Sequence, residues 1–325
     1  MQKVPATKNK ILLLDPVHPL IRVRFEEYGY QCDYFPDLSG NDLLKIAGNY
    51  RGIIVRSKFT VDRNFLDAAT NLEFIGRVGA GMENIDVEYA CKRGIRCYNS
   101  PEGNRDAVGE HAVGMLLALL NHMTRADRQV RQGIWSREEN RGVEIMGKTV
   151  GIIGYGNMGS AFARRIKGFE ANVIAYDKYK KRFSDAYVTE ATMEQIFSDT
   201  DILSLHVPLT AETRYLVDQD YLNRFKKPVW LVNTSRGQVI KTADLVKNLK
   251  SGKVPGAALD VLEFEDASFG FLNSKDPDFA YLAASDRVIL TPHIAGWTRE
   301  SNEKLAGILV EKIQKGERLK KLSGD

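Results

Sequence analysis

Short apolar segments alternate with segments of helical pattern along most of the chain, and this alternation limits the fold more than any other feature. In the first part of the chain the predicted strands span residues 10–15, 30–35, 52–57, 74–79 and 95–99, with helices between them. A second alternating set begins at Lys148 and runs to about Thr291. Alternation of this kind is typical of a parallel sheet covered by helices. We therefore predict an α/β fold with two doubly wound parallel-sheet domains.

A hinge is expected between the two domains. Residues 100–104 (Ser-Pro-Glu-Gly-Asn) break the first alternating set, and a helical segment rich in Ala, Leu and Met follows to about Gln132. A last helix, from about Arg299 to Gly316, is too far from any further strand to begin a new unit, so we expect it to pack on the first domain. We predict a smaller, flavodoxin-like domain of residues 1–103 and 297–325 and a Rossmann-type domain of residues 104–296. Two chain crossings would create a cleft that can close.

Composition predicts a globular protein in a reducing compartment. The 325 residues are ample for two domains, and 43% hydrophobic with 27% charged residues is ordinary. The three cysteines form no C-x-x-C pair, which argues against a disulfide framework or a metal site. The apolar runs at residues 11–14 and 112–120 are too short for a signal peptide and for a membrane span, respectively. We expect a cytoplasmic protein without a membrane partner.

The net charge of +4 fits an enzyme that handles anions, and it fits ordinary surface charge equally well. Nucleic-acid binding would need a basic stripe with interleaved aromatic residues. Only residues 178–182 (Lys-Tyr-Lys-Lys-Arg) approach such a stripe, and they directly follow a predicted strand that has another explanation. We therefore expect no nucleic-acid partner.

A glycine-rich loop follows the first strand of the second set. Residues 154–159 (Gly-Tyr-Gly-Asn-Met-Gly) come directly after the apolar segment 150–153 and open a helix near Met158. This is the context that the dinucleotide-binding fingerprint requires. Gly154 would permit the tight turn, Gly156 would let the backbone approach a pyrophosphate, and Gly159 would let the helix pack closely on the strand.

The next predicted strand, residues 172–176, is followed by Asp177. Its distance from the glycines is close to the roughly 20 residues expected for an acid that holds the ribose hydroxyls. A carboxylate at this place repels a 2′-phosphate, whereas the basic run after it could neutralise one. We favour NAD over NADP.

Four strands of the second set end in polar residues: His206, the segment 233–236 with Arg236, Asp260 with the nearby Glu265, and His293. Ligands of open parallel sheets bind beyond the carboxyl ends of the strands, so these side chains should converge. Arg236 offers a planar fork for a carboxylate. Histidine titrates near neutrality, and Glu265 would favour the charged imidazolium of His293. Each of these residues alone could equally be a surface or structural residue.

Together these segments resemble a known family. Residues 233–237 (Asn-Thr-Ser-Arg-Gly), 258–261 with Glu265, and 290–296 (Leu-Thr-Pro-His-Ile-Ala-Gly) are similar to three signature segments of the D-2-hydroxyacid dehydrogenases. The match extends to residues 151–159, 204–210, 78–81 and 84–86, so that it covers nearly the whole chain. The resemblance implies an NAD-dependent enzyme that interconverts a small anionic D-2-hydroxy acid and its 2-keto acid.

The resemblance also implies roles for individual residues. Arg236 would bind the substrate carboxylate, His293 would be the general acid and base, and Glu265 would hold and polarise His293. The implied cofactor-binding residues lie on loops of the second set: Gly154, Tyr155, Gly156, Asn157, Met158, Gly159, Tyr176, Asp177, His206, Val207, Pro208, Thr213, Thr234, Ser235, Arg236, Asp260, His293 and Gly296. The implied substrate-binding residues come from the first domain, together with Arg236: Arg56, Ser57, Arg77, Val78, Gly79, Ala80, Gly81 and Asn104.

Two arginines bear on the identity of the substrate. Arg56 and Arg77 resemble the phosphate-binding positions of 3-phosphoglycerate dehydrogenases, although glyoxylate and hydroxypyruvate reductases share parts of the pattern, and both could be ordinary surface or interdomain charges. We expect 3-phosphoglycerate and 3-phosphohydroxypyruvate, a pair that belongs to serine biosynthesis, with a glyoxylate or hydroxypyruvate reductase as the alternative. No regulatory domain is expected after the last helix.

The chain departs from the family pattern in three places. Lys241 stands where an acidic residue often opens a helix, with Thr242 available as the cap; Glu83 replaces a common Asp; and residues 264–282 carry extra aromatic and acidic side chains. The alternative from another class of protein is an NAD-sensing corepressor of the C-terminal-binding-protein type, which keeps the equivalents of Arg236, Glu265 and His293. Formate and phosphite dehydrogenases share the fold.

A homodimer through the NAD domain is also expected. The helix is apolar over residues 112–120, and Trp135 lies in a predicted loop where one chain has little to cover it. Exposed patches of this kind usually mark interfaces. We place the interface between residue 104 and about residue 147.

Overall fold

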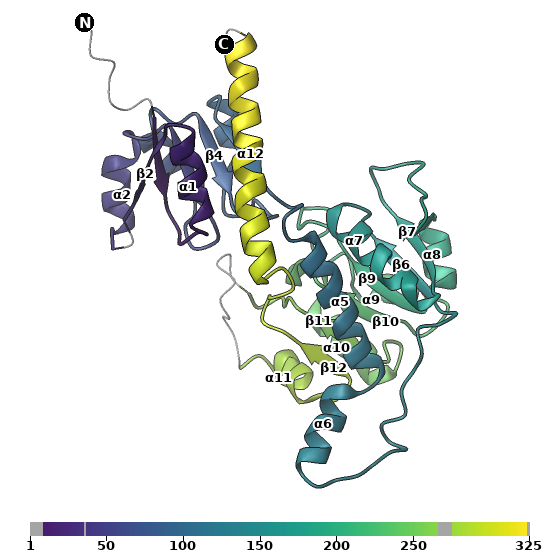
Figure 1. The fold of residues 1–325 in the computed structure, drawn as a ribbon. Coiled ribbons are helices and arrows are strands. Elements are labelled where there is room, and N and C mark those ends of the chain that lie inside the picture. The colour runs from purple at the N-terminus through teal and green to yellow at the C-terminus, as the bar shows by residue number, and fades with distance from the viewer. Residues whose placement is uncertain (1–8, 36, 266–274, 324–325) are drawn as a thin grey trace, which may run out of the picture. The chain divides into compact units, whose positions relative to one another are not determined.

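The computed structural model describes residues 9–35, 37–265 and 275–323 (Figure 1). These residues form two compact units. Unit 1 contains residues 9–104 and 297–323, and unit 2 contains residues 105–265 and 275–296.

Unit 1 is built on a five-stranded, fully parallel sheet in the order β2-β1-β3-β4-β5. Its strands are β1 (Lys10–Leu13), β2 (Gln31–Tyr34), β3 (Gly52–Val55), β4 (Phe74–Arg77) and β5 (Arg96–Asn99). This is the strand order of flavodoxin-like sheets, in which ligands bind beyond the carboxyl ends of the strands. Arg56, Val78 and Ser100 directly follow β3, β4 and β5 and therefore lie at that edge.

Helices cover both faces of the sheet in unit 1. The helices are α1 (Leu20–Glu27), α2 (Gly40–Ala47), α3 (Arg63–Ala68), α4 (Val87–Lys92) and α12 (Arg299–Ser323). Buried side chains of α1 and α12 form one core with Phe74, and those of α2, α3 and α4 form a second core with Ile53 and Ile75. Ser39, Asp62 and Asp86 cap the starts of α2, α3 and α4 with side-chain oxygens.

Unit 2 is built on a seven-stranded parallel sheet in the order β12-β11-β10-β9-β6-β7-β8. Its strands are β6 (Thr149–Ile153), β7 (Asn172–Tyr176), β8 (Thr189–Glu190), β9 (Ile202–Leu205), β10 (Trp230–Asn233), β11 (Ala257–Leu259) and β12 (Val288–Leu290). The order reverses between β6 and β9, as in dinucleotide-binding sheets, and a ligand binds at such a reversal. The two doubly wound parallel sheets predicted from the sequence are thus confirmed.

Unit 2 also carries helices on both faces. They are α5 (Arg105–Leu120), α6 (Met123–Arg131), α7 (Asn157–Ile166), α8 (Met193–Asp199), α9 (Gln219–Asn223), α10 (Thr242–Ser251) and α11 (Pro277–Ala284), with short 3-10 helices at η1 (Lys167–Phe169) and η2 (Gly237–Val239). Helices α5 and α7 pack together on one face (Figure 1), and α8 to α11 contribute to the core on the other. No helix in the described part of the chain is long and apolar enough to cross a membrane.

Three local predictions were wrong. The helix expected to run to about Gln132 is two helices, because the chain turns at His122, whose φ of 52° lies in the left-handed region. The last helix continues to Ser323 rather than ending at Gly316. Thr242 is the first residue of α10 and does not cap it; the Glu263 carboxylate accepts its N–H at 2.8 Å.

Candidate active site

The glycine-rich loop joins β6 to α7 and leaves room for an anion. Gly154 has φ +92°, and a Cβ atom there would lie 2.5 Å from the His206 carbonyl oxygen. A Cβ atom on Gly159 would lie 2.1 Å from the Gly154 carbonyl oxygen, so α7 packs directly on the loop. Around Gly156, by contrast, no other part of the described chain comes within 4 Å of a Cβ atom. Gly156 is the N-cap of α7, where backbone N–H groups attract anions, so the loop fits a dinucleotide pyrophosphate.

The Asp177 carboxylate ties the loop after β7 to the glycine-rich loop. Oδ2 accepts the N–H of Tyr155 at 2.8 Å, and Oδ1 accepts the N–H groups of Tyr179 and Lys180 at 2.9 and 3.0 Å. Burial raises the pKa of the Asp177 carboxyl, but these three hydrogen bonds and the Lys180 charge outweigh it, so that the pKa lies below its usual range. The side chain is therefore an anion at neutral pH.

The basic run after Asp177 is engaged with unit 2. Lys178 Nζ lies 2.7 Å from Glu212 Oε2, and the Tyr179 hydroxyl donates to the same oxygen at 2.7 Å. Lys180 Nζ donates to the Tyr155 carbonyl oxygen at 2.7 Å. Two of the cations that could accept a 2′-phosphate thus already have partners.

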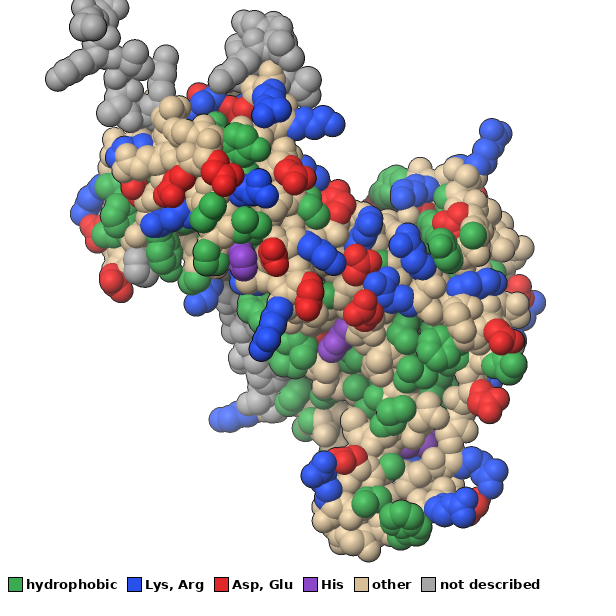
Figure 2. All heavy atoms as spheres, viewed as in Figure 1, with side chains coloured by type: hydrophobic (Ala, Val, Ile, Leu, Met, Phe, Trp, Pro, Cys, Tyr) green, Lys and Arg blue, Asp and Glu red, His purple; other side chains and the backbone are tan. Residues whose placement is uncertain are grey.

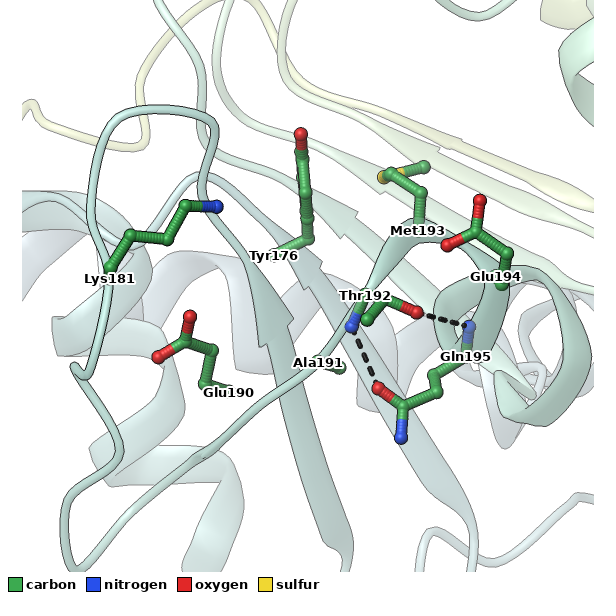
Figure 3. Close-up of a pocket in the computed structure, with 8 residues that line it drawn as sticks. All are labelled: Tyr176, Lys181, Glu190, Ala191, Thr192, Met193, Glu194 and Gln195. Carbon is green, nitrogen blue, oxygen red and sulfur yellow. Dashed lines mark hydrogen bonds between the residues drawn. The ribbon is translucent and has the colours of Figure 1, made fainter.

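A pocket of about 560 Å³ opens beside the end of β7 (Figure 3). It is lined by Tyr176, Lys181, Glu190, Ala191, Thr192, Met193, Glu194 and Gln195. Lys181 Nζ lies 5.8 Å from the centre of the Tyr176 ring, and Thr192 and Gln195 form the capping box that starts α8. The volume is within the range of small-molecule sites, and Tyr176 places the pocket next to Asp177, the predicted adenosine end.

The loop after β9 contains His206, Val207, Pro208 and Thr213. His206 Nε2 lies 2.9 Å from the Ser204 hydroxyl, and burial lowers the pKa of His206 to about 3, so the ring is neutral at physiological pH. Its Nδ1 is buried and has no hydrogen-bond partner among the described residues. The Thr213 hydroxyl donates to the Pro208 carbonyl oxygen at 2.6 Å and holds the loop together. The His206 ring is thus neutral and does not act as a general acid at physiological pH.

The side chain of Tyr155 contacts residues outside the glycine-rich loop. Its ring stacks on Phe183 with 5.2 Å between the ring centres, and its hydroxyl donates to Asp185 at 2.7 Å. Asn157 and Met158 form the first turn of α7. The Tyr155 side chain therefore anchors the glycine-rich loop to the segment that contains Phe183 and Asp185.

The buried side chain of Asn233 organises the turn after β10. Its Oδ1 accepts the N–H of Ser235 at 3.0 Å and the Ser235 hydroxyl at 2.7 Å, and its Nδ2 donates to the Arg236 carbonyl oxygen at 3.0 Å. The Arg236 guanidinium donates to the Ser235 carbonyl oxygen at 2.6 Å. The Thr234 hydroxyl is buried and lacks a hydrogen-bond partner within the described ranges. This turn therefore holds Arg236 and leaves a buried polar atom that a cofactor could satisfy.

The residue after Arg236 brings this turn against the segment that carries Glu265. A Cβ atom on Gly237 would lie 1.9 Å from the Leu262 carbonyl oxygen and 2.6 Å from the Glu263 nitrogen. Only glycine allows this close approach of two backbones. The arginine and the carboxylate expected in the active site are thereby joined through adjacent loops of one unit.

The buried Asp260 carboxylate holds the loop of His293. Asp260 is 1% exposed; its Oδ1 accepts the Thr291 hydroxyl at 2.5 Å and the Ile294 N–H at 2.9 Å, and its Oδ2 accepts the Ala295 N–H at 2.8 Å. His111 Nε2, from α5, lies 3.5 Å from the carboxylate and 3.1 Å from the Thr291 hydroxyl oxygen. Burial raises the pKa of the Asp260 carboxyl, but hydrogen bonds from His111, Thr291 and the two N–H groups lower it below its usual range.

His293 and Glu265 are joined by a short hydrogen bond. His293 Nδ1 lies 2.7 Å from Glu265 Oε2, and the other carboxylate oxygen accepts the N–H of Leu262. The His293 backbone takes φ 55°, in the left-handed region, and its N–H donates to the Asp260 carbonyl oxygen at 2.7 Å. Glu265 thus fixes the Nδ1 side of the His293 ring.

In unit 1, Arg77 supports the loop formed by residues 78–81. Arg77 is 7% exposed, and its Nη1 donates to the Val78 carbonyl oxygen at 3.1 Å. Gly79 has φ +150°, and a Cβ atom there would lie 1.3 Å from the same Nη1. The Ala80 carbonyl oxygen accepts a hydrogen bond from Asn99 at 2.6 Å. The arginine side chain therefore packs over the loop itself.

Arg56, Ser57 and Asn104 also belong to unit 1. The Arg56 N–H donates to the buried carboxylate of Asp15 at 2.5 Å, and its guanidinium packs on Trp297. Ser57 follows it in a half-buried position. Asn104 has a buried Oδ1 without a hydrogen-bond partner in the part of the chain that the structure describes.

The residues in these networks that were not singled out from the sequence include His111, Asp15 and Trp297. Trp297 directly follows Gly296 of the quoted signature, so extending that segment by one residue would have found it. The extra stretch at residues 264–282 lies partly outside the described residues, since 266–274 are not among them. Within the described ranges no cluster of three or more His, Cys, Asp or Glu residues could hold a metal ion.

Comparison with known proteins identifies the family. The model of the D-isomer specific 2-hydroxyacid dehydrogenase NAD-binding domain matches residues 113–295. The chain is 37% identical to a hydroxypyruvate reductase of Thermotoga maritima over 86% of this chain and 88% of the relative. The chain therefore belongs to the D-isomer specific 2-hydroxyacid dehydrogenases, a family of NAD(P)-dependent enzymes that act on CH–OH groups.

Other relatives differ in length and in the activity for which they are named. The chain is 36% identical to the D-3-phosphoglycerate dehydrogenase of Archaeoglobus fulgidus over 94% of this chain but only 56% of that protein, so it spans little more than half of that relative. The crystal structure of D-lactate dehydrogenase from Aquifex aeolicus, complexed with NAD and lactic acid, aligns with a TM-score of 0.81 and 26% identity over 98% of both chains.

The Asp260 network predicts a pH-dependent loss of stability in Asp260→Asn. The amide cannot accept the same set of hydrogen bonds, so the free energy of unfolding should fall by about 2–3 kcal/mol at pH 7. Because the folded-state pKa is lowered, this stabilisation is present above the unfolded-state pKa of about 4 and is lost as pH falls through the folded value. Urea unfolding at pH 7 and in acid measures the difference.

The matched control is Asp220→Asn, at an exposed position in α9. It should change the free energy of unfolding by less than about 0.5 kcal/mol. An equal loss in both variants, or a difference for Asp260→Asn that persists in acid, would contradict the role given to the Asp260 charge.

Proposed function

We propose that the chain interconverts D-3-phosphoglycerate and 3-phosphohydroxypyruvate with NAD as cofactor, a reaction that belongs to serine biosynthesis. The observation that carries this proposal is Arg56. Its half-buried guanidinium stands at the carboxyl edge of the unit 1 sheet and makes no hydrogen bond to any described residue. A cation in addition to Arg236 suits a substrate with a second anionic group. The similarity to the Archaeoglobus fulgidus enzyme supports the same substrate.

In this proposal the residues of unit 2 bind the substrate carboxylate and protonate the 2-oxygen of the substrate. The Arg236 fork holds the substrate carboxylate through two parallel N–H donors. His293 gives its Nε2 proton to the 2-oxygen during reduction and takes it back during oxidation, while Glu265 at 2.7 Å holds the ring through Nδ1. The bound nicotinamide supplies the hydride. In unit 1, loop 78–81 presents backbone N–H groups to the substrate carboxylate.

The preference for NAD rests on charge. Asp177 is an anion held by three backbone N–H groups, and in this proposal its carboxylate faces the ribose hydroxyls. Lys178 is paired with Glu212, and Lys180 with the Tyr155 carbonyl oxygen, so two of the four cations of the basic run are occupied. A 2′-phosphate would therefore meet a fixed negative charge. These features favour NAD over NADP.

The second candidate function is reduction of hydroxypyruvate or glyoxylate. It is favoured by Arg77, whose guanidinium is buried against its own loop and so acts on that loop rather than on a distal phosphate. The Thermotoga maritima hydroxypyruvate reductase, matched over most of its length, supports it.

A substrate panel tests the proposed function. Initial rates with 3-phosphohydroxypyruvate, hydroxypyruvate and glyoxylate, each with NADH and with NADPH, should give the highest kcat/KM for the phosphorylated acid with NADH. Arg56→Ala should lower that value by about 10- to 150-fold, which corresponds to the 1.5–3 kcal/mol of a charged hydrogen bond. Equal values for phosphorylated and plain acids would favour the second candidate, and a preference for NADPH would refute the cofactor assignment.

Glu265→Gln tests the proton-transfer pair. The amide lacks the negative charge that Glu265 places 2.7 Å from His293 Nδ1, so kcat/KM for reduction should fall while NADH affinity is unchanged. His293→Gln should abolish turnover while NADH still binds, as fluorescence titration would record. An unchanged kcat/KM in Glu265→Gln would remove Glu265 from this role.

We also propose that the chain forms a homodimer through unit 2. Five large apolar residues in the segment between α5 and β6 are exposed: Met123, Val130, Ile134, Trp135 and Met146. Trp135 is 79% exposed, and Figure 2 shows apolar side chains gathered over the region of α5 and α6. A second copy of the chain would cover this surface.

Sedimentation velocity at micromolar concentration should show a dimer, and Trp135→Glu should shift it toward monomer because a charge would be buried in the interface. The control is Tyr28→Glu, at an exposed position in unit 1, which should leave the dimer intact. A wild-type monomer, or equal dissociation by both variants, would count against this interface.

A further inference from the structure

Arg56 and Trp297 form a stacked pair within unit 1. The guanidinium carbon of Arg56 lies 4.0 Å from the centre of the Trp297 indole ring. Trp297 is 63% exposed, although it is one of the largest apolar side chains, whereas Arg56 is half-buried. The two residues come from opposite ends of the chain: Arg56 follows β3, and Trp297 precedes α12.

Stacking fixes the plane of the guanidinium without using its hydrogen-bond donors. The indole contacts the flat face of the guanidinium, while the five N–H groups point outward in the plane of the group. No hydrogen bond or ion pair of the guanidinium to another residue is found in the described part of the chain. The donors are therefore available to a ligand.

The base of the Arg56 side chain is fixed as well. The Arg56 N–H donates to Asp15 Oδ2 at 2.5 Å, and its carbonyl oxygen accepts a hydrogen bond from Asn84 at 3.3 Å. Asp15 is 2% exposed and Asn84 is 5% exposed, so both anchors are buried. With the backbone held by two buried side chains and the head group held by the indole, little rotamer freedom remains to be lost on binding.

The local charge favours an anion. Burial lowers the pKa of Arg56, and the Asp15 carboxylate opposes this effect. The group stays a cation, because arginine is not deprotonated in proteins. A half-buried cation with open donors and fixed orientation matches a phosphate, which arginine binds through two parallel N–H···O contacts.

We infer that Trp297 is a positioning residue that holds the Arg56 guanidinium for the phosphate monoester of the substrate, and so contributes to the choice between phosphorylated and plain 2-keto acids. The inference rests on the proposed function, which supplies the phosphorylated substrate. It assigns to Trp297 a role in specificity and none in proton or hydride transfer.

The test compares Trp297→Leu and Trp297→Phe with the wild type on 3-phosphohydroxypyruvate and on glyoxylate, which has no distal group. In Trp297→Leu the ratio of kcat/KM for the phosphorylated acid to that for glyoxylate should fall about 5- to 30-fold, the range that about 1–2 kcal/mol of cation–π interaction corresponds to. The change should appear in KM for the phosphorylated acid, with kcat little altered. Trp297→Phe keeps an aromatic face and should retain most of the ratio.

Two controls separate positioning from folding. Tyr89→Leu removes the aromatic partner of a different arginine in unit 1, Arg63, which lies 5.3 Å from the centre of the Tyr89 ring. This change should leave the ratio unaltered. NADH affinity, measured by fluorescence titration, should be the same in all variants. In Arg56→Ala the additional Trp297→Leu change should have no further effect on the ratio, because the two residues act as one unit.

The outcomes distinguish the inference from the proposed function. If the wild type prefers the phosphorylated acid and Arg56→Ala loses that preference while Trp297→Leu keeps it, the inference is wrong and the proposed function stands. If Trp297→Leu lowers kcat/KM for both acids alike, Trp297 has only a general structural role and the inference is wrong. If the wild type shows no preference and Arg56→Ala changes nothing, the proposed substrate is wrong and the inference falls with it.

Discussion

The buried carboxylate of Asp260 is the interaction on which the catalytic end of unit 2 depends. A charge that is 1% exposed is costly unless it is fully hydrogen-bonded, and here a hydroxyl, two backbone N–H groups and the imidazole of His111 surround it. These groups fix the loop in which His293 takes a left-handed backbone conformation. The position of the His293 ring against Glu265 follows from that loop. In the proposed mechanism, Asp260 thus positions the proton-transferring histidine without touching the transferred proton.

Both sheets use a buried carboxylate to order the segments that follow their strands. Each parallel sheet places its polar residues beyond the carboxyl ends of its strands, and a buried carboxylate then orders the segments that follow: Asp260 in unit 2 and Asp15 in unit 1. Asp177 orders the cofactor loops in the same way, through three backbone N–H groups. Side-chain substitutions leave the backbone N–H donors in place. The geometry of these loops therefore depends on the few carboxylates that accept hydrogen bonds from them.

Periodicity and strand ends predicted the two sheets, and the glycine-rich loop predicted the strand–loop–helix unit that contains Gly154. These features are local, because a strand and the residue after it are neighbours in sequence. Side-chain partners were not predictable in the same way: nothing in the sequence pairs His111 with Asp260, lays Arg77 over Gly79, or stacks Trp297 on Arg56. The turn at His122, with its left-handed backbone, was also missed, because the helical pattern of the sequence continues through it.

The central claim is that His293 Nε2 and the Arg236 fork act on one substrate while Glu265 holds Nδ1. A crystal structure of the dead-end complex with NAD⁺ and a 2-keto acid, in which both reactants are oxidised and no turnover occurs, tests it most directly. The account predicts Nε2 within hydrogen-bond distance of the 2-oxygen, the Arg236 guanidinium on the substrate carboxylate, and the Nδ1 contact with Glu265 retained. A keto acid bound with its 2-oxygen away from His293, or with its carboxylate away from Arg236, would contradict the account.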